Sequence, residues 1–358
     1  MGRSAYNENM SQAHPATANA LRFPFAEPPA FGEPREVAPG ILWLRLPLPF
    51  ALNHINVWIL RDDDGVTLVD SGIFNDVTQA AWNGVFDGLL KGVPVKQVIS
   101  THYHPDHMGA AGWLSQRFGA PFFTTQAEWD AARLYADTPQ DILMAQLVAE
   151  YCRAGLPHDL ADQFMSVRAL KRNHNGPLAP TVNILDTGSR IAAGGTTWRL
   201  VIGRGHSPEL GALYAEERGV LIAGDQVLPG ITPNVSVQPH DLDADPLKLF
   251  LATLQDFRRL PEGTFVLPSH KLPFYGLRER IDDIVAHHGT RLVIAREATA
   301  NGATAANVMA ALFPRPLDAH QTFFAIGETL AHLNYLVGTG EMTRAEEGGV
   351  YRYRSHAA

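Results

Sequence analysis

VISTHYHPDHMG, residues 98–109, places three histidines and one aspartate within six positions, directly after a short apolar run. His102 and His104 are two residues apart, so in an extended segment at a strand end both side chains point to one side. A turn containing a proline follows, after which Asp106 and His107 can approach the same point. Imidazole and carboxylate groups suit zinc, iron or manganese as ligands. The stretch therefore predicts a metal-binding loop, whereas a polar loop rich in histidine by chance is the ordinary alternative.

The four candidate ligands in this stretch are too few to coordinate two metal ions fully. Three further candidates occur in similar settings elsewhere in the chain. His206 in GRGHSPE, Asp225 in VLIAGDQ and His270 in FVLPSH each follow a short apolar strand. Proteins with α/β folds place their chemistry where strands end in turns. Taken singly, each has an ordinary alternative: His206 could be a turn residue, Asp225 an Asx-turn or helix N-cap, and His270 a surface residue. Together with the cluster they predict one shared site.

The composition of the whole chain excludes several classes of protein. The chain has 358 residues, of which 46% are hydrophobic and 18% charged, which is typical of one large folded domain or two. A net charge of −8 argues against a nucleic-acid partner, because such partners require a basic surface. A single cysteine, Cys152, excludes an internal disulfide and favours a cytoplasmic protein. No signal peptide and no apolar run of about 20 residues is found, so no membrane partner is expected.

The composition and the hydrophobic pattern change along the chain, and these changes predict its domain organisation. A polar, proline-rich start is expected to form a mobile tail and an extended arm. Short apolar strands with a DDDG hairpin signal then alternate with helices, which indicates α/β layers. A helical insertion without strands interrupts them, and three helices followed by a hairpin with a Gly-Gly turn close the chain in a winged-helix pattern. The corresponding ranges are 1–36 for the tail and arm, 37–275 for the α/β domain, 127–175 for the insertion and 276–358 for the winged-helix-like domain.

The motifs THYHPDH, GHSPE, AGD and PSH, with LVDSG upstream, resemble the ordered motif set of the metallo-β-lactamase superfamily over about residues 37–275. This resemblance implies a four-layer αββα sandwich with metals at one edge of the sheets. The last part of the chain and the segment PLPFALNHINVWIL are similar to the branch of β-lactamase-like protein 2, which carries a C-terminal winged-helix domain. After GHSP that branch often continues with Glu-His, where this chain has Glu209-Leu210.

The resemblance also implies a role for each candidate ligand. The first metal would be held by His102, His104 and His206, and the second by Asp106, His107 and His270. Asp225 would bridge the two ions, and Asp70 in LVDSG would hydrogen-bond a ligand or the cluster loop and fix its orientation. Asp106, Asp225 and Asp70 form the expected catalytic set. Two divalent ions are expected, zinc before iron or manganese, while His54 and His240 are assigned to a pocket rim or to solvent.

A dinuclear site of this kind predicts hydrolysis by a metal-bound hydroxide. The superfamily's class B1 β-lactamases usually have a cysteine where this chain has Asp225, so β-lactam hydrolysis is disfavoured. A thioester or ester, such as acyl-CoA or acyl-glutathione, is the first choice of substrate, with a small-molecule acyl group as partner. The alternatives are an endoribonuclease or other phosphodiesterase, a lactonase, and an iron-dependent redox enzyme.

The environment of the site is expected to select the substrate. The insertion 127–175 and the loop 228–245 both follow metal-bearing segments, so both can overhang the same edge of the sheets. Neither carries a concentration of positive charge, which disfavours RNA. The third helix of the C-terminal part has no Arg or Lys to meet phosphates, which disfavours a DNA-binding regulator. We expect this C-terminal part instead to pack against the catalytic domain or against a second subunit in a homodimer.

Overall fold

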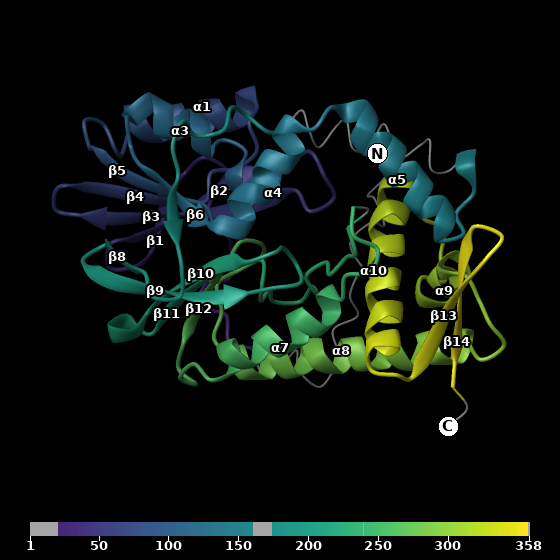
Figure 1. The fold of residues 1–358 in the computed structure, drawn as a ribbon. Helices are drawn as coiled ribbons and strands as arrows, with labels where there is room; N and C mark the ends of the chain where they lie inside the picture. Colours follow the sequence, from purple (N-terminus) through teal and green to yellow (C-terminus); the bar gives the residue numbers. More distant parts are fainter. Residues whose placement is uncertain (1–20, 160–173, 239, 357–358) are drawn as a thin grey trace, which may run out of the picture.

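The computed structural model describes residues 21–159, 174–238 and 240–356 (Figure 1). Two β-sheets form its centre. The first has seven strands in sequence order, antiparallel from β1 to β4 and parallel from β4 to β7. Its strands are β1 (Arg35–Ala38), β2 (Ile41–Pro47), β3 (His54–Asp62), β4 (Gly65–Val69), β5 (Val95–Ile99), β6 (Phe122–Thr125) and β7 (Asn183–Leu185).

The second sheet has five strands in the order β12-β11-β10-β9-β8, with a single parallel pair, β11 and β12. Its strands are β8 (Arg190–Ala193), β9 (Thr196–Gly203), β10 (Leu210–Ala215), β11 (Val220–Gly224) and β12 (Phe265–Pro268). A two-stranded hairpin, β13 (Met342–Glu347) and β14 (Val350–Ser355), stands apart from both sheets.

Strand β2 shows why the two sheets pack face to face. Ile41 and Trp43 point to one side of the sheet and Leu42 and Leu44 to the other, because side chains alternate along a strand, and all four are buried. The side of Trp43 belongs to a core shared with the second sheet, including Trp198 and Leu213. A strand buried on both faces needs a layer on each side, which predicts helices outside each sheet.

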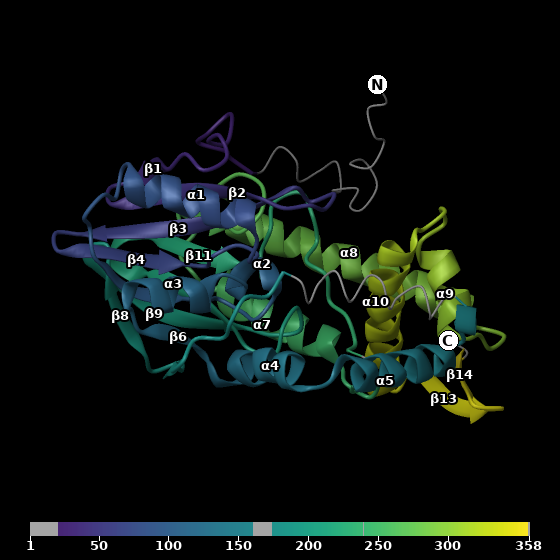
Figure 2. The ribbon, with the colours of Figure 1, turned by 90° about the horizontal axis from the view of Figure 1, so that it is seen from above.

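Helices supply these outer layers (Figures 1 and 2). The outer side of the first sheet packs against Trp82 of α1 and Leu114 of α3, and the outer side of the second against Phe250 of α7 and Ile281 of α8. The expected αββα sandwich is therefore present. The helices are α1 (Asp76–Asp87), α2 (Pro105–Met108), α3 (Ala111–Phe118), α4 (Gln126–Asp137), α5 (Gln140–Arg153), α7 (Pro246–Arg258), α8 (Leu277–Ala298), α9 (Ala305–Leu312) and α10 (Ala319–Gly338), with a short 3₁₀ turn, η1 (Glu216–Arg218). None of the described helices is long and apolar enough to span a bilayer.

The insertion and the arm lie against the body of the protein. Helices α4 and α5 form the described part of the insertion, whereas most of the helix expected in DLADQFMSVRAL lies outside the described residues. The tail at residues 1–20 lies outside them too. The arm is extended from residue 21 onwards and is docked, since Arg22 and Tyr275 exchange backbone hydrogen bonds of 3.1 and 2.9 Å. Phe23 packs beside Phe274, with ring centroids 6.4 Å apart.

The C-terminal part consists of α8, α9 and α10 followed by the hairpin β13–β14, the element order that the sequence predicts. Gly348 and Gly349 form the hairpin turn, and both have positive φ, which only glycine adopts without strain. The start of α10 is fixed by a reciprocal capping box between Asp318 and Gln321. Helix α7, which carries the core residue Phe250, is an element that the strand-helix pattern did not predict.

Helices α8 and α10 hold the loop that follows β11. Arg280 of α8 is buried and donates hydrogen bonds of 2.6 and 2.7 Å to the carbonyls of Leu228 and Ile231. The carbonyl of Gly327 in α10 accepts from the backbone N–H of Val237 at 3.1 Å. Asn334, two turns further along α10, donates to two carbonyls later in the loop. The loop is therefore fixed from the C-terminal side.

Replacing Gly327 by alanine should destabilise the protein. A Cβ at this position would lie 2.9 Å from both Cβ and Oγ of Ser236, so the helix and the loop would have to separate. We expect a loss of about 1–3 kcal/mol in the free energy of unfolding, which outweighs the better helix propensity of alanine. The matched control is Gly289→Ala in α8, where a Cβ meets nothing within 4 Å and should stabilise slightly. Equal effects of the two substitutions in urea unfolding would contradict this packing.

Candidate metal centre

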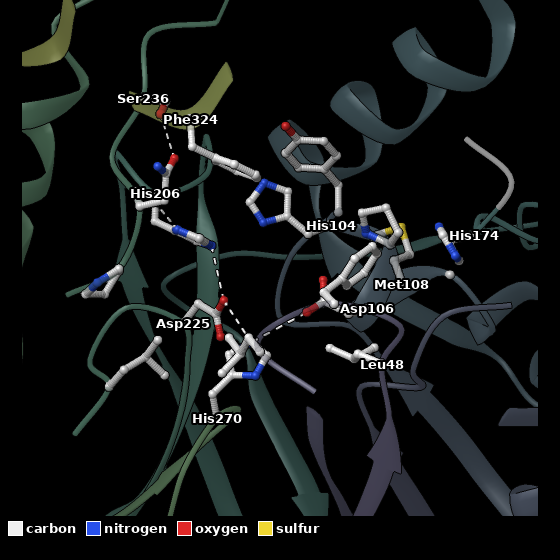
Figure 3. Close-up of a pocket in the computed structure, with 18 of the residues that line it drawn as sticks. Leu48, His104, Asp106, Met108, His174, His206, Asp225, Ser236, His270 and Phe324 are labelled. Carbon is white, nitrogen blue, oxygen red and sulfur yellow. Dashed lines mark hydrogen bonds and ion pairs between the residues drawn. The ribbon is translucent and has the colours of Figure 1, made fainter. Parts of the chain in front are cut away.

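The seven predicted ligands meet at one end of the two sheets. Figure 3 shows five of them on the wall of the pocket: His104, Asp106, His206, Asp225 and His270. The loop after β5 and the short helix α2 supply His102, His104, Asp106 and His107. The second sheet supplies the other three, which follow β9, β11 and β12: His206, Asp225 and His270. Each sheet therefore contributes only part of the cluster, and the face-to-face packing of the sheets completes it.

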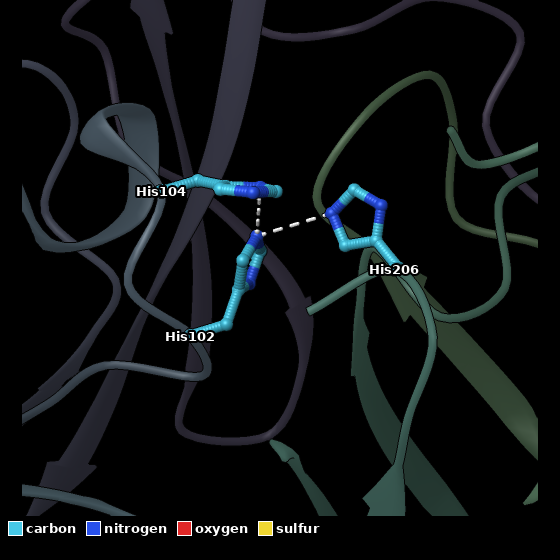
Figure 4. Close-up of side chains that lie close together, drawn as sticks. All are labelled: His102, His104 and His206. Atoms are coloured by element: carbon cyan, nitrogen blue, oxygen red, sulfur yellow. Dashed lines mark hydrogen bonds between the residues drawn. The ribbon is translucent and has the colours of Figure 1, made fainter. Parts of the chain in front are cut away.

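Three imidazoles form the first group of ligands (Figure 4). His102 Nε2 lies 3.0 Å from His104 Nδ1 and 3.3 Å from His206 Nε2. Nitrogen atoms this close to one another can bind the same cation. Three imidazole ligands on one cation are typical of zinc. This group has the composition expected for the first metal.

Asp106, His107 and His270 form the second group. Asp106 Oδ2 lies 3.5 Å from His270 Nε2 and 3.7 Å from His107 Nε2. Asp225 stands between the two groups: Oδ1 is 3.5 Å from His107 Nε2, and Oδ2 is 3.5 Å from the Nε2 atoms of both His206 and His270. One carboxylate thus faces both groups, which is the arrangement expected of a bridging ligand.

The cluster fits metal ions on its own chemistry. His107 Nε2 and Asp225 Oδ1 are buried, and neither makes a hydrogen bond within the described part of the chain. The two atoms face each other at 3.5 Å without forming a hydrogen bond, and a cation bound by both would satisfy them. Within each group of three, the ligand atoms lie within 4.8 Å of one another.

Asp70 orients His107 from behind. Its Oδ2 accepts a hydrogen bond of 2.8 Å from His107 Nδ1, which leaves Nε2 directed at the cluster. Its Oδ1 accepts from the backbone N–H of Thr101 at 2.8 Å, at the start of the ligand loop. Asp70 therefore contacts a ligand and the cluster loop. Its φ of 62° places it in the left-handed region, which is uncommon for a residue other than glycine and marks a constrained backbone.

Backbone carbonyls orient two further histidines. His206 Nδ1 donates to the carbonyl of Asn234 at 2.8 Å, and His270 Nδ1 donates to the carbonyl of His54 at 2.7 Å. The ring of His54 accepts a hydrogen bond of 2.9 Å from the N–H of Lys271, the residue after the ligand. The assignment of His54 to a rim or to solvent was therefore wrong, because its side chain is buried behind the ligand segment. His240 is exposed, as expected.

Glu128 is a buried residue that the motif analysis missed. It lies in the first turn of α4 and is fully buried. Its Oε2 accepts from the N–H of Tyr103, and its Oε1 accepts from the hydroxyl of Ser207 and the N–H of Glu209, at 2.9, 2.6 and 2.6 Å. Tyr103 and Ser207 adjoin ligands of the first group, so one carboxylate joins the two ligand loops. A lone Glu at the start of a helix carries no motif that would reveal this.

Burial lowers the pKa of a histidine, because it disfavours the charged form. Nearby carboxylates raise the pKa, and at some histidines of the cluster their effect is the larger one. Burial and the neighbouring imidazoles hold the pKa of His102 well below its usual range. At His270 burial is outweighed by Asp225 and Asp106, which raise its pKa to about 9. The pKa of His107 is also raised well above its usual value, because Asp70, Asp106 and Asp225 outweigh its burial. In the metal-free protein, therefore, His107 and His270 are protonated at neutral pH, whereas His102 is neutral.

A cavity of about 1310 Å³ opens beside the cluster and is lined by His104, Asp106, His206, Asp225 and His270. Both segments expected to overhang the site reach it. Trp129, Tyr135 and Leu143 of the insertion line the cavity, as do Leu228 and Ile231 of the loop after β11. A further part of its wall comes from α8, α10 and Phe313 after α9, which the sequence did not indicate, and other parts come from residues 48–52 and 174–179.

Comparison with known proteins agrees with this architecture. Residues 51–270 match the family model of the metallo-beta-lactamase superfamily, and residues 293–356 match that of a metallo-beta-lactamase-like C-terminal domain. The chain therefore belongs to the metallo-β-lactamase superfamily. The superfamily resemblance is thus confirmed, while assignment to the branch of β-lactamase-like protein 2 and to a winged-helix domain stays a prediction.

Two solved structures and one curated relative are similar over nearly the whole chain. A β-lactamase domain protein from Burkholderia ambifaria is 41% identical with a TM-score of 0.87, covering 95% of this chain and 100% of that one. A metallo-β-lactamase family protein from Thermus thermophilus is 28% identical with a TM-score of 0.76, covering 90% and 100%. The probable metallo-hydrolase YqjP of Bacillus subtilis (strain 168) is 23% identical over 321 residues, which cover 88% of this chain and 98% of YqjP.

Metal binding should release protons. His107 and His270 are protonated in the metal-free protein at pH 7, and each must lose its proton to become a ligand. We expect about two protons to be released when the second group is filled at pH 7, and the apparent affinity to rise with pH up to about 9. Calorimetric titration of zinc in buffers of different ionisation enthalpy measures this number. A heat of binding that does not depend on the buffer would contradict the assignment.

Glu128→Gln should weaken the first group of ligands with the fold intact. The amide has one acceptor oxygen, so its NH₂ would face an N–H or O–H donor that the carboxylate now accepts from. We expect the zinc affinity of this group to fall about 10- to 100-fold. Competition with a chromophoric chelator measures it, and Glu150→Gln, at a surface ion pair with Arg153 of α5, is the matched control. Unchanged zinc affinity in Glu128→Gln would show that the link between the loops is dispensable.

Proposed function

We propose that this protein is a metal-dependent hydrolase that uses two divalent ions, zinc in the first place, to hydrolyse a thioester or ester. The observation that carries the proposal is the convergence of seven ligand side chains beside one large cavity, whose wall includes five of them. Membership of the superfamily and similarity to a probable metallo-hydrolase support the hydrolytic class. Iron and manganese are the alternative metals, and a lactonase is an alternative within the same chemistry.

A pair of bound divalent ions would lower the pKa of a water molecule and polarise the oxygen under attack. His102, His104 and His206 would hold one ion, and Asp106, His107 and His270 the other. Asp225 would contact both and keep them together, while Asp70 fixes the ring of His107 through its Nδ1 proton. These roles follow the superfamily motifs and agree with the distances among the side chains.

The lining of the cavity supports an acyl substrate over RNA. Its wall includes Phe50, Trp129, Tyr135, Phe323 and Phe324. Apart from the ligands, the charged side chains among its described lining residues are Lys271, Arg291 and Glu328. RNA binding needs several phosphate contacts and a basic surface, so the endoribonuclease alternative takes second place.

The C-terminal residues 276–358 are proposed to form a second domain of the winged-helix type that serves the catalytic domain 37–275. Helix α10 carries no Arg or Lys, so this domain lacks the usual means of meeting DNA phosphates. The single cysteine supports a cytoplasmic location. A small-molecule acyl compound is the proposed partner, and a homodimer is the proposed assembly.

Hydrolysis should be tested with zinc-loaded protein on acyl-CoA and glutathione thioesters, lactones, nitrocefin and single-stranded RNA. We expect thioesters or esters to be the best substrates. Asp225→Ala should reduce turnover by at least about 100-fold without unfolding the protein, because both ions lose a shared ligand. The exposed Asp87→Ala in α1 is the control. Efficient, salt-sensitive RNA cleavage that His104→Ala abolishes, without thioesterase activity, would put the endoribonuclease first.

A further inference from the structure

The cavity beside the metal cluster extends to a charged pair on the C-terminal helices. Gln321, Phe324 and Glu328 of α10 line it at spacings of three and four residues, and His287 and Arg291 of α8 line it four residues apart. Such spacings place side chains on one face of each helix. Two helices from the C-terminal part therefore turn a continuous face toward the space that adjoins the ligands.

Arg291 and Glu328 form an ion pair in the wall of this cavity. Arg291 Nε lies 3.0 Å from Glu328 Oε1, and the two side chains are 13% and 16% exposed. The guanidinium lies over the ring of Phe313, 4.3 Å from its centroid. Apart from this contact of Nε with Glu328, Arg291 Nε and Nη2 are buried and make no hydrogen bond with any described residue. A planar guanidinium has five N–H donors, so this pair retains hydrogen-bonding capacity that the described chain does not use.

Apolar side chains separate the pair from the metal ligands. Phe324 of α10 lines the same cavity as the ligands His104 and His206 (Figure 3). Glu328 is four residues further along the helix, which is a shift of about 6 Å along the axis. Tyr151 and Phe323 extend the apolar wall on this side, with ring centroids 5.8 Å apart. A substrate that spans the cavity would thus meet the metals at one end, an apolar stretch, and then a charged pair.

We propose that Arg291 and Glu328 bind an uncharged polar group, a hydroxyl or an amide, carried by the acyl chain of the substrate at a distance from the scissile bond. This inference rests on the proposed thioester or ester hydrolysis and specifies its acyl group. An ion pair presents donors and acceptors side by side, so a group that can both accept and donate satisfies both partners. A second carboxylate would place two negative charges on one guanidinium away from water, which is unfavourable.

The proposal is tested with two matched series of N-acetylcysteamine thioesters whose acyl chains have four to twelve carbons, one plain and one with an ω-hydroxyl. At one chain length we expect the ω-hydroxyl to lower KM about tenfold, the contribution of a net hydrogen bond or two. Arg291→Met and Glu328→Gln should each reduce this ratio to near one, with kcat for the plain acyl chain and the zinc content unchanged. Circular dichroism confirms that the variants fold, and Glu328→Gln keeps the size of the side chain.

Arg296→Met is the matched control, because Arg296 lies on the same helix α8 and pairs with Glu341 at the surface, where both are about half exposed. Binding of the free ω-hydroxy and plain acids to zinc-loaded protein, measured by calorimetry, gives a readout independent of turnover. If no thioester is hydrolysed but the ω-hydroxy acid binds more tightly through Arg291, the proposed function fails and the polar subsite stands. Absence of any ω-hydroxyl preference, its persistence in both variants, or a stronger preference for an ω-carboxylate would overturn the subsite.

Discussion

The whole architecture depends on holding buried imidazoles and carboxylates at the shared end of two sheets. Three carboxylates, Asp70, Asp106 and Asp225, and five histidines are buried or nearly so in one small volume, where unpaired charge is expensive. The outer nitrogens of His107, His206 and His270 are therefore committed to a carboxylate or to backbone carbonyls. These contacts leave the inner nitrogens convergent, so that cations can replace protons there without a rearrangement of the rings.

The same constraint explains why the C-terminal helices are part of the site. His206 is oriented by the carbonyl of Asn234, which belongs to the loop that Arg280 and Gly327 hold from α8 and α10. The C-terminal part thus supports a metal ligand and also lines the cavity with Phe324, Arg291 and Glu328. Because α8 and α10 both support His206 and line the cavity, a shift of these helices would change the orientation of the ligand and the shape of the cavity together.

Much of the fold follows from local patterns in the sequence. The C-terminal order of three helices and a hairpin is as predicted, and so is the hairpin turn at Gly348 and Gly349, because strong periodicity and turn chemistry are local properties. Helix α7 was not predicted, although its buried residues Leu247, Phe250, Leu254 and Phe257 recur at helical spacing. Glu128 was missed and His54 was assigned wrongly to a pocket rim or solvent, because their partners are distant in sequence: Glu128 contacts Ser207, and His54 contacts His270.

The sequence by itself determined the superfamily, the seven candidate ligands and most of the order of the elements. Ligand type and spacing can be read directly from the motifs. Only the tertiary structure decided how the two groups of ligands face each other across Asp225, since they come from separate sheets and meet through side-chain packing. It alone decided that Glu128 joins two ligand loops and that Arg291 and Glu328 form an ion pair in the wall of the cavity. In the sequence Glu128, Arg291 and Glu328 are isolated charged residues. Their roles depend on their burial and on neighbours that come together only when the chain folds.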